Sequence, residues 1–136
     1  MQLTIIEAND ETMTLAYAVA RIVYAETLAT SLRVVEAMTS MIANASRARN
    51  ESVAKIISDA SLFESINAES IRHKYINVDA TRKDFQMCLR VALRMLHGNL
   101  GDMCRGATRF HRTELLPTWA VARGYIADID GILFYA

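Results

Sequence analysis

The sequence predicts an α+β domain that is mostly helical and carries a small antiparallel β element near its C-terminus. Apolar residues recur every three or four positions through the first two-thirds of the chain. After Gly98 they give way to two short aromatic and β-branched segments. The chain has 136 residues, one proline and no low-complexity tract. We therefore expect one domain over residues 1–136, long enough to bury a core.

The first predicted helix runs from about Asp10, whose side chain can cap it, to about Glu26. Glu26 continues the apolar stripe of this helix, so a carboxylate lies where a core residue belongs. A carboxylate directed at a core is unfavourable unless it is paired, protonated or opens into a cleft. We interpret Glu26 as a catalytic acid, and the alternative is a helix-terminal carboxylate in solvent. The stripe consists of Leu15, Val19, Ile22 and Val23.

Two more helices and a long connection are expected next. The second helix begins after Thr30 or Ser31, and Asn50 is expected to cap a shorter third helix. Glu36, on the flank of the second helix, is interpreted as a member of a structural ion pair; the alternative is that it orients Glu26 or a water. Residues 61–78 are aperiodic, which predicts an irregular surface connection of the kind that often forms binding loops.

The fourth predicted helix has the clearest signals. Thr81 and Asp84 have the spacing of a capping box, and Gly98 is placed to end the helix. Its apolar stripe consists of Phe85, Cys88, Leu89, Ala92 and Leu96. Beyond it, residues 107–111 and 132–135 each follow a glycine and predict two strands, paired antiparallel, with Pro117 and Trp119 in the excursion between them.

Composition argues against several classes of protein. Fifteen basic and fifteen acidic residues give a formal net charge of zero, which disfavours nucleic-acid binding through phosphate neutralisation. No run reaches the roughly 18 apolar residues of a membrane helix. His73, His97 and His111 share no helix-face spacing, and the cysteines form no metal-ligand spacing with them, so we expect no metal and no cofactor. Cys88 is expected in the core, and a disulfide with Cys104 is the less favoured alternative.

Several segments together resemble one family. They read ARIVYAE at residues 20–26, IAN at 42–44, CLRVA at 88–92, GATRFHR at 106–112, LPTWA at 116–120 and IDGILFY at 129–135. In this order and spacing they resemble the catalytic domain of SleB-type (spore-cortex-lytic) cell wall hydrolases, over about Leu15 to Tyr135. The resemblance implies a lysozyme-like fold and cleavage of peptidoglycan between N-acetylmuramic acid and N-acetylglucosamine, with Glu26 as the catalytic acid of a lytic transglycosylase.

The chain departs from the family pattern directly after Glu26. The family often reads Glu-Ala-Arg-Gly-Glu, whereas this chain has threonine at the second acidic position, Thr30, and Ala29 in place of the glycine. Glu26 is therefore the only acid of this motif. A lytic transglycosylase needs only one, because the 6-hydroxyl of muramic acid attacks intramolecularly. Ile22, Val23 and Tyr24 are expected to surround Glu26 with apolar groups that favour its protonated form.

Substrate contacts are expected from aromatic rings, which can stack on sugars, and from the first predicted strand. The candidates are Tyr24, Phe63, Trp119, Thr108, Arg109, Phe110 and His111. Only one of Thr108 and Arg109 can face the cleft, because side chains alternate along a strand. His111, neutral near pH 7, could hydrogen-bond a sugar or an N-acetyl group.

The expected partner is the glycan strand of peptidoglycan, bound by a monomer, with neither nucleic acid nor membrane involved. Two alternatives remain: a non-catalytic module that binds peptidoglycan with the same fold, and a helical protein that binds another protein. Residues 1–11 contain no basic region followed by an apolar run, so we expect no secretory signal. Synthesis in the cytoplasm would then leave the route to the wall open, unless a leader precedes this chain.

Overall fold

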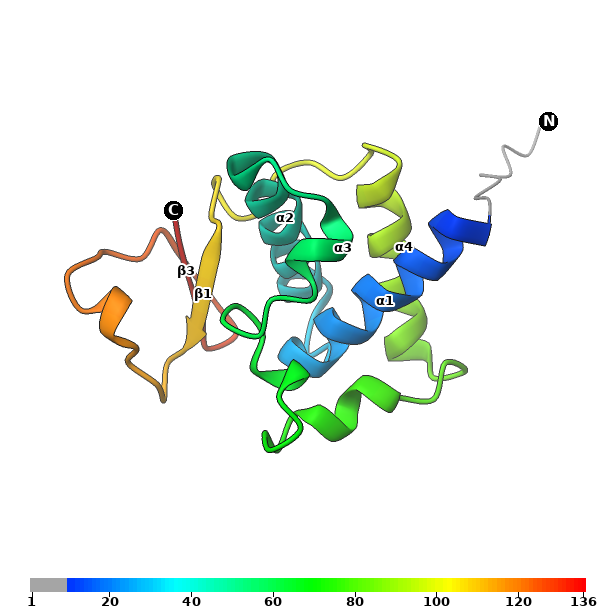
Figure 1. The fold of residues 1–136 in the computed structure, drawn as a ribbon, viewed down its shortest axis with the longest axis horizontal. Coiled ribbons are helices and arrows are strands. Elements are labelled where there is room, and N and C mark those ends of the chain that lie inside the picture. Colours follow the sequence, from blue (N-terminus) through cyan, green and yellow to red (C-terminus); the bar gives the residue numbers. More distant parts are fainter. Residues whose placement is uncertain (1–9) are drawn as a thin grey trace.

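A computed structural model describes residues 10–136, and it has the predicted α+β architecture (Figure 1). The expectation about a secretory signal falls largely on residues 1–9, outside the described part. Within the described residues four α-helices come first: α1 (Asp10–Thr27), α2 (Leu32–Arg49), α3 (Val53–Ile56) and α4 (Lys83–Leu96). Three strands follow near the C-terminus: β1 (Arg109–Arg112), β2 (Ala127–Ile129) and β3 (Ile132–Tyr135). Short 3-10 helices lie in the connections: η1 (Glu64–Ile66), η2 (His73–Asn77) and η3 (Thr118–Ala120).

The long helices pack around one hydrophobic core. Helix α1 lies against α4 and α2, and the predicted stripe residues Val19 and Val23 are fully buried there. Phe85 and Cys88 of α4 fill the same core, as their helical spacing predicted. The core extends into the sheet through Phe110 and Phe134. One contiguous cluster of buried side chains therefore joins the helices to the β element.

The sheet has the order β1-β3-β2 and is antiparallel throughout. The predicted pairing of the two strands is confirmed, with Phe110 opposite Phe134 and Arg112 opposite Ile132. Strand β2 was not predicted. It turns into β3 through Asp130 and Gly131, whose φ angles are 52° and 77°. Asp-Gly is favoured in such a two-residue hairpin turn, so this dipeptide was the available signal.

Two predicted helix caps are wrong. Asn50 ends α2 in a left-handed conformation, whereas the side chain of Ser52 caps α3 by accepting a hydrogen bond from the Lys55 amide. Asparagine tolerates the left-handed region that a helix C-cap requires. The hydroxyl of Thr81 bonds Asp79 instead of capping α4, which begins after Arg82 without a side-chain cap.

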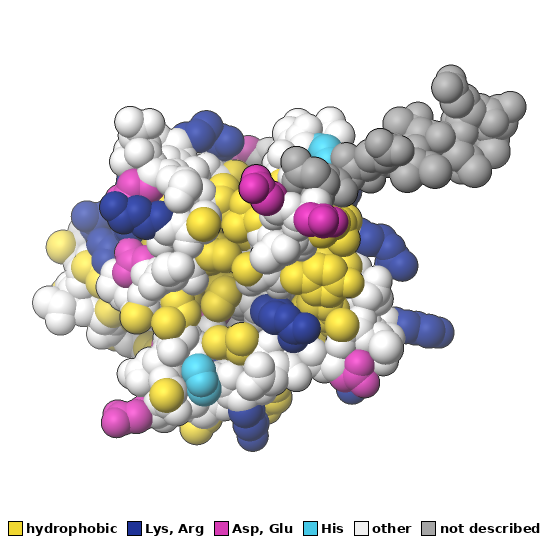
Figure 2. Space-filling model, turned by 45° about the vertical axis from the view of Figure 1, so that its right-hand side comes forward, with side chains coloured by type: hydrophobic (Ala, Val, Ile, Leu, Met, Phe, Trp, Pro, Cys, Tyr) yellow, Lys and Arg dark blue, Asp and Glu magenta, His cyan; other side chains and the backbone are white. Residues whose placement is uncertain are grey.

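The connection over residues 61–78 is built from turns and the 3-10 helices η1 and η2. It runs past the end of α1 and also packs along that helix (Figure 1). The face drawn in Figure 2 carries hydrophobic side chains among charged ones. Within residues 10–136, no helix has the length and hydropathy needed to cross a bilayer.

Both cysteines are reduced and buried, and burial raises the pKa of each thiol to about 12. Glu36 pairs with Arg94 of α4 at 3.0 Å, which confirms the structural ion pair. That pair lies between α2 and α4, so Glu36 does not orient Glu26.

Candidate functional site

Glu26 lies one residue before the end of α1 and is almost completely buried, with 1% of its surface exposed. Its burial follows from the stripe on which it lies, because Val19, Ile22 and Val23 carry that face of the helix into the core. The prediction that Glu26 points inward is confirmed. The alternative of a helix-terminal carboxylate in solvent is wrong.

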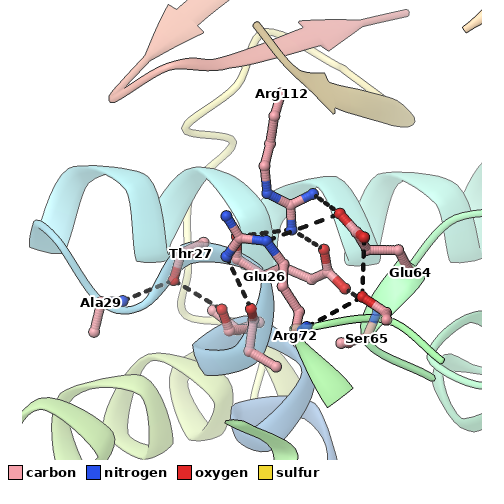
Figure 3. Close-up of polar contacts among 10 residues, drawn as sticks. Glu26, Thr27, Ala29, Glu64, Ser65, Arg72 and Arg112 are labelled. Carbon is pink, nitrogen blue, oxygen red and sulfur yellow. Dashed lines mark hydrogen bonds and ion pairs between the residues drawn. The ribbon is translucent and has the colours of Figure 1, made fainter. Parts of the chain in front are cut away.

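The surroundings of the Glu26 carboxylate are polar, which corrects the expectation of an apolar pocket. One oxygen, Oε1, accepts a hydrogen bond from Nη2 of Arg112 at 2.5 Å. The other, Oε2, accepts one from the backbone amide of Ser65 at 2.9 Å. Figure 3 shows Arg112 reaching down from β1 to this carboxylate. Because side chains alternate along β1, Arg112 points to the same side as Phe110, toward the helices.

Arg112 also binds a second carboxylate. Its Nη1 donates to Oε1 of Glu64 at 2.6 Å, so one guanidinium bridges Glu26 and Glu64 (Figure 3). The two carboxylates differ in exposure: the Glu26 side chain is 0% exposed and the Glu64 side chain 40%. A planar guanidinium can bridge two carboxylates in this way because its N–H donors are fixed in a rigid fork.

Two guanidiniums also satisfy the carbonyl groups at the end of α1. Nη1 of Arg72, from the connection, donates to the carbonyl oxygens of Ala25 and Glu26 at 3.2 and 3.4 Å. Nη2 of Arg112 donates to the same Glu26 carbonyl at 3.3 Å. Positive charge at a helix C-terminus is favourable, because the last carbonyls carry partial negative charge. Burial, with the nearby charge of Arg112, lowers the pKa of Arg72.

The turn after Glu26 is left-handed at two consecutive residues, Leu28 (φ 55°) and Ala29 (φ 52°). The hydroxyl of Thr27 accepts a hydrogen bond from the Ala29 amide at 3.1 Å and donates to the Val23 carbonyl at 2.7 Å. Thr30, the residue at the second acidic position, donates to Asp130 at 2.9 Å. The turn is therefore tied to the β2–β3 hairpin.

Two pockets adjoin the site, and Glu26 and Arg112 line both of them. The first has a volume of about 350 Å³ and a wall of apolar and aromatic side chains, lined among others by Leu115, Leu116, Pro117 and Trp119. The second has a volume of about 200 Å³ and is mostly polar, lined among others by Arg72, Thr113, Glu114 and Asp130. Glu26 thus stands between an apolar hollow and a polar one.

Three of the predicted substrate-binding residues line the first pocket with Glu26: Phe110, His111 and Trp119. His111 cannot serve a sugar as expected, because both ring nitrogens are already bonded within the protein. Nδ1 lies 2.8 Å from the Arg112 carbonyl and Nε2 lies 2.8 Å from the Tyr135 hydroxyl. A carbonyl oxygen only accepts, so Nδ1 carries the proton.

The other four predicted substrate-binding residues lie outside the linings of both pockets. Phe63 is fully buried against Phe110, and Tyr24 packs on Phe85 with its hydroxyl 3.3 Å from Asp84, so neither ring offers a sugar platform. Arg109 lies over the Trp119 ring at 4.2 Å. Thr108 only joins the sheet, through its amide and the Tyr135 carbonyl. The expectations for Phe63 and Tyr24 are corrected, because both rings are buried in the core and periodicity alone did not distinguish them from exposed rings. Substrate contacts of Thr108 and Arg109 stay a prediction.

The sequence reasoning missed Glu64, Ser65 and Arg72, and it gave Arg112 no specific partner. One signal pointed to Arg112: it lies two residues after the apolar Phe110 and so shares its inward face. A charged residue on an inward face needs a charged partner, which is the same argument that singled out Glu26. Glu64, Ser65 and Arg72 lie in an aperiodic connection, where no comparable signal exists.

Within the described residues, no three His, Cys, Asp or Glu side chains come together as a metal site.

Comparison of the chain with protein-family models, with curated proteins and with solved structures finds no match in any of the three. The fold and site therefore define a small α+β domain with a buried carboxylate–guanidinium centre between two pockets. The likeness to SleB-type hydrolases rests on the sequence motifs alone.

Proposed function

We propose that this protein cleaves peptidoglycan at the β-1,4 bond between N-acetylmuramic acid and N-acetylglucosamine, as a lytic transglycosylase. One observation carries the proposal: Glu26, a buried carboxyl group at a helix end, lines two adjoining pockets. Glu26 belongs to the lining of each pocket, so a glycan bound in either one lies close to this carboxyl group. The motifs shared with SleB-type hydrolases include Glu26, and they supply the substrate class.

The reaction needs one group that first donates and then accepts a proton. Protonated Glu26 gives its proton to the glycosidic oxygen as the bond between that oxygen and C1 of the muramic acid breaks. The ionised carboxylate then takes the proton of the muramic acid 6-hydroxyl, whose oxygen bonds to C1. The products are a 1,6-anhydromuramic end and a free 4-hydroxyl on N-acetylglucosamine, and Glu26 regains its proton. The attack is intramolecular, so the absence of an acid at Thr30 is compatible with activity.

The first pocket has the surface that a sugar ring needs. Trp119 is half-buried. Arg109 lies over its ring, and the rings of His111 and Tyr135 make T-shaped contacts with it. These contacts hold the indole in one orientation at the pocket wall. Leu116, 71% exposed, extends the same apolar wall into solvent. Apolar faces of this kind suit the flat face of a pyranose or the methyl of an N-acetyl group.

The test compares the clearing of purified cell walls by the wild-type protein and by Glu26→Gln. The variant keeps the shape of the side chain but has no proton to give, and we expect a loss of about 10²–10⁴-fold. Glu36→Gln is the matched control, because Glu36 pairs with Arg94 away from both pockets. Mass spectrometry of the released fragments should find anhydro ends. Equal clearing by wild type and Glu26→Gln would overturn the assignment of Glu26.

A second candidate is a module that binds peptidoglycan without cleaving it. Two observations favour it: Thr30 stands at the second acidic position, and Glu26 is held in an ion pair with Arg112. Sedimentation with insoluble walls separates the two. A binding module sediments with the walls, as does its Glu26→Gln variant, and neither releases fragments. A helical protein that binds another protein would not sediment with walls.

A further inference from the structure

The bridge from Glu26 through Arg112 to Glu64 contains one positive charge and two negative ones. The side chain of Arg112 is 7% exposed and that of Glu26 is 0% exposed, so solvent screens their attraction little. A guanidinium keeps its charge at any pH at which proteins fold. If Glu26 were its only partner, protonation of Glu26 would leave a buried cation uncompensated, which is strongly unfavourable. The acid form that the proposed reaction requires would then be rare.

Glu64 removes this difficulty by giving Arg112 a partner in both states of Glu26. Its contact with Arg112, at 2.6 Å, is nearly as close as that of Glu26, at 2.5 Å. Glu64 lies at the wall of the first pocket and is 40% exposed, so it stays ionised at lower cost than a buried carboxylate. Ser70 holds its other oxygen through a hydroxyl hydrogen bond of 2.9 Å. When Glu26 takes up a proton, the charge of Arg112 remains compensated by Glu64.

The local fold couples these groups closely. Glu64 and Ser65 are adjacent in η1, and the Ser65 amide donates to the Glu26 carboxylate while Glu64 binds Arg112. The Ser65 carbonyl in turn lies 2.7 Å from Nδ1 of His73, a further titratable group behind η1. Arg72 faces the cluster from the connection, with Nε 3.8 Å from Glu64. Glu114, which follows β1 and lines the second pocket, interacts electrostatically with Arg72.

We propose that Glu64 is a positioning residue that, through Arg112, favours the protonated form of Glu26. The proposal rests on the proposed function only in taking that proton to be the one used in catalysis. Glu64 touches the guanidinium and not the reacting atoms. Its role is to share the positive charge that would otherwise keep Glu26 ionised.

The proposal predicts that two charge deletions act in opposite directions. Glu64→Gln leaves Arg112 to Glu26 alone, so the carboxyl of Glu26 should lose its proton at a pH lower by about one unit. Arg112→Gln removes the cation, and the same titration should move to higher pH by about one unit or more. The direct readout is the carboxyl carbon resonance of Glu26, followed by NMR against pH, which does not depend on activity.

Wall clearing against pH is the second readout. With Glu64→Gln, the alkaline limb of the activity profile should move to lower pH. Activity at neutral pH should fall about tenfold, because a shift of one pH unit changes the fraction of protonated Glu26 about tenfold. Glu69→Gln is the matched control, an exposed glutamate of the same connection, and should leave both readouts unchanged. Glu64 is partly exposed, so Glu64→Gln is expected to fold even if Arg112→Gln does not.

The outcomes separate the two proposals. An NMR titration that moves down in Glu64→Gln supports the role of Glu64, whether or not the protein clears walls. Absence of clearing with that shift present overturns the proposed function alone. A titration of Glu26 that is unchanged or moves up in Glu64→Gln overturns the role of Glu64, even if the wild-type protein clears walls.

Discussion

The Glu26 carboxylate and the Arg112 guanidinium come from positions 86 residues apart and meet at 2.5 Å, both buried. The contact joins the end of the first helix to the first strand of the sheet. It also joins the two parts of the fold that the sequence shows as separate, a helical region and a short β region. The candidate site lies where these two parts touch.

Loss of one partner from this pair should be costly. Where Glu26 is ionised, Arg112→Leu leaves a buried carboxylate without its cation, and we expect the free energy of unfolding to fall by about 3–5 kcal/mol at alkaline pH. The double variant Glu26→Leu/Arg112→Leu replaces both charges with apolar groups and should be much closer to wild type. Urea denaturation followed by circular dichroism measures both. A loss below about 1 kcal/mol for Arg112→Leu, the range of exposed pairs, would mean that the pair is solvated in solution.

Trp119 should contribute to substrate binding more than any other aromatic residue. Trp119→Leu removes a flat apolar face from the first pocket, and we expect about tenfold weaker binding to cell walls, which corresponds to about 1.4 kcal/mol. Tyr125→Leu is the control, because Tyr125 is an exposed aromatic outside both pocket linings. Sedimentation with a range of wall concentrations measures the affinities. Equal binding by Trp119→Leu and wild type would place the glycan elsewhere.

Asp59 fixes the start of the connection that lines the first pocket, because its carboxylate accepts hydrogen bonds from the amide and the hydroxyl of Ser61. Hydrogen bonds from Ser61, then Arg49, lower the pKa of Asp59 from 3.8 to about 2. A carboxyl group whose pKa is lowered by folding stabilises the folded state at any pH above its ordinary pKa. This contribution is lost as the pH falls through about 2. Asp59→Asn should therefore lower the free energy of unfolding by about 1 kcal/mol near neutral pH, allowing for solvent screening.

The pH dependence is the decisive part of the Asp59 experiment. The difference between Asp59→Asn and wild type should shrink as the pH falls toward 2, where the carboxyl group is protonated in both states. Urea titrations at several pH values measure it. Asp128→Asn, an exposed change in β2, is the control. A difference that stays constant with pH would indicate that shape, and not charge, makes Asp59 important.

The turn after Glu26 should be strained at Ala29, whose φ is 52°. The left-handed region costs a residue with a Cβ roughly 1 kcal/mol and costs glycine almost nothing. Ala29→Gly should therefore raise the free energy of unfolding by about 1 kcal/mol and the melting temperature by about 4 °C. Ala18→Gly, the same change in the middle of α1, should lower stability by about 1 kcal/mol. Destabilisation by both changes would show that the turn is not left-handed in solution.

Local patterns account for the parts of the fold that were predicted correctly. Helical spacing placed Val19, Val23 and Phe85 in the core, and it placed Glu26 among them. The β-branched and aromatic segments predicted the pairing of β1 with β3. These features depend on which residues lie two, three or four positions apart. Such short-range spacing can be read from a single sequence. The Asp130-Gly131 turn between β2 and β3 is an equally local signal, because both of its residues have positive φ.

The sequence by itself determined that a carboxylate ends an apolar helical face and that a short β region follows the helices. Only the tertiary structure decided what surrounds that carboxylate: Arg112 from β1, Ser65 and Glu64 from an aperiodic connection, and two adjoining pockets. The physical reason is range. Periodicity records which side of an element faces inward, whereas an ion pair between distant residues depends on how two elements pack, and that packing is set by the whole core at once.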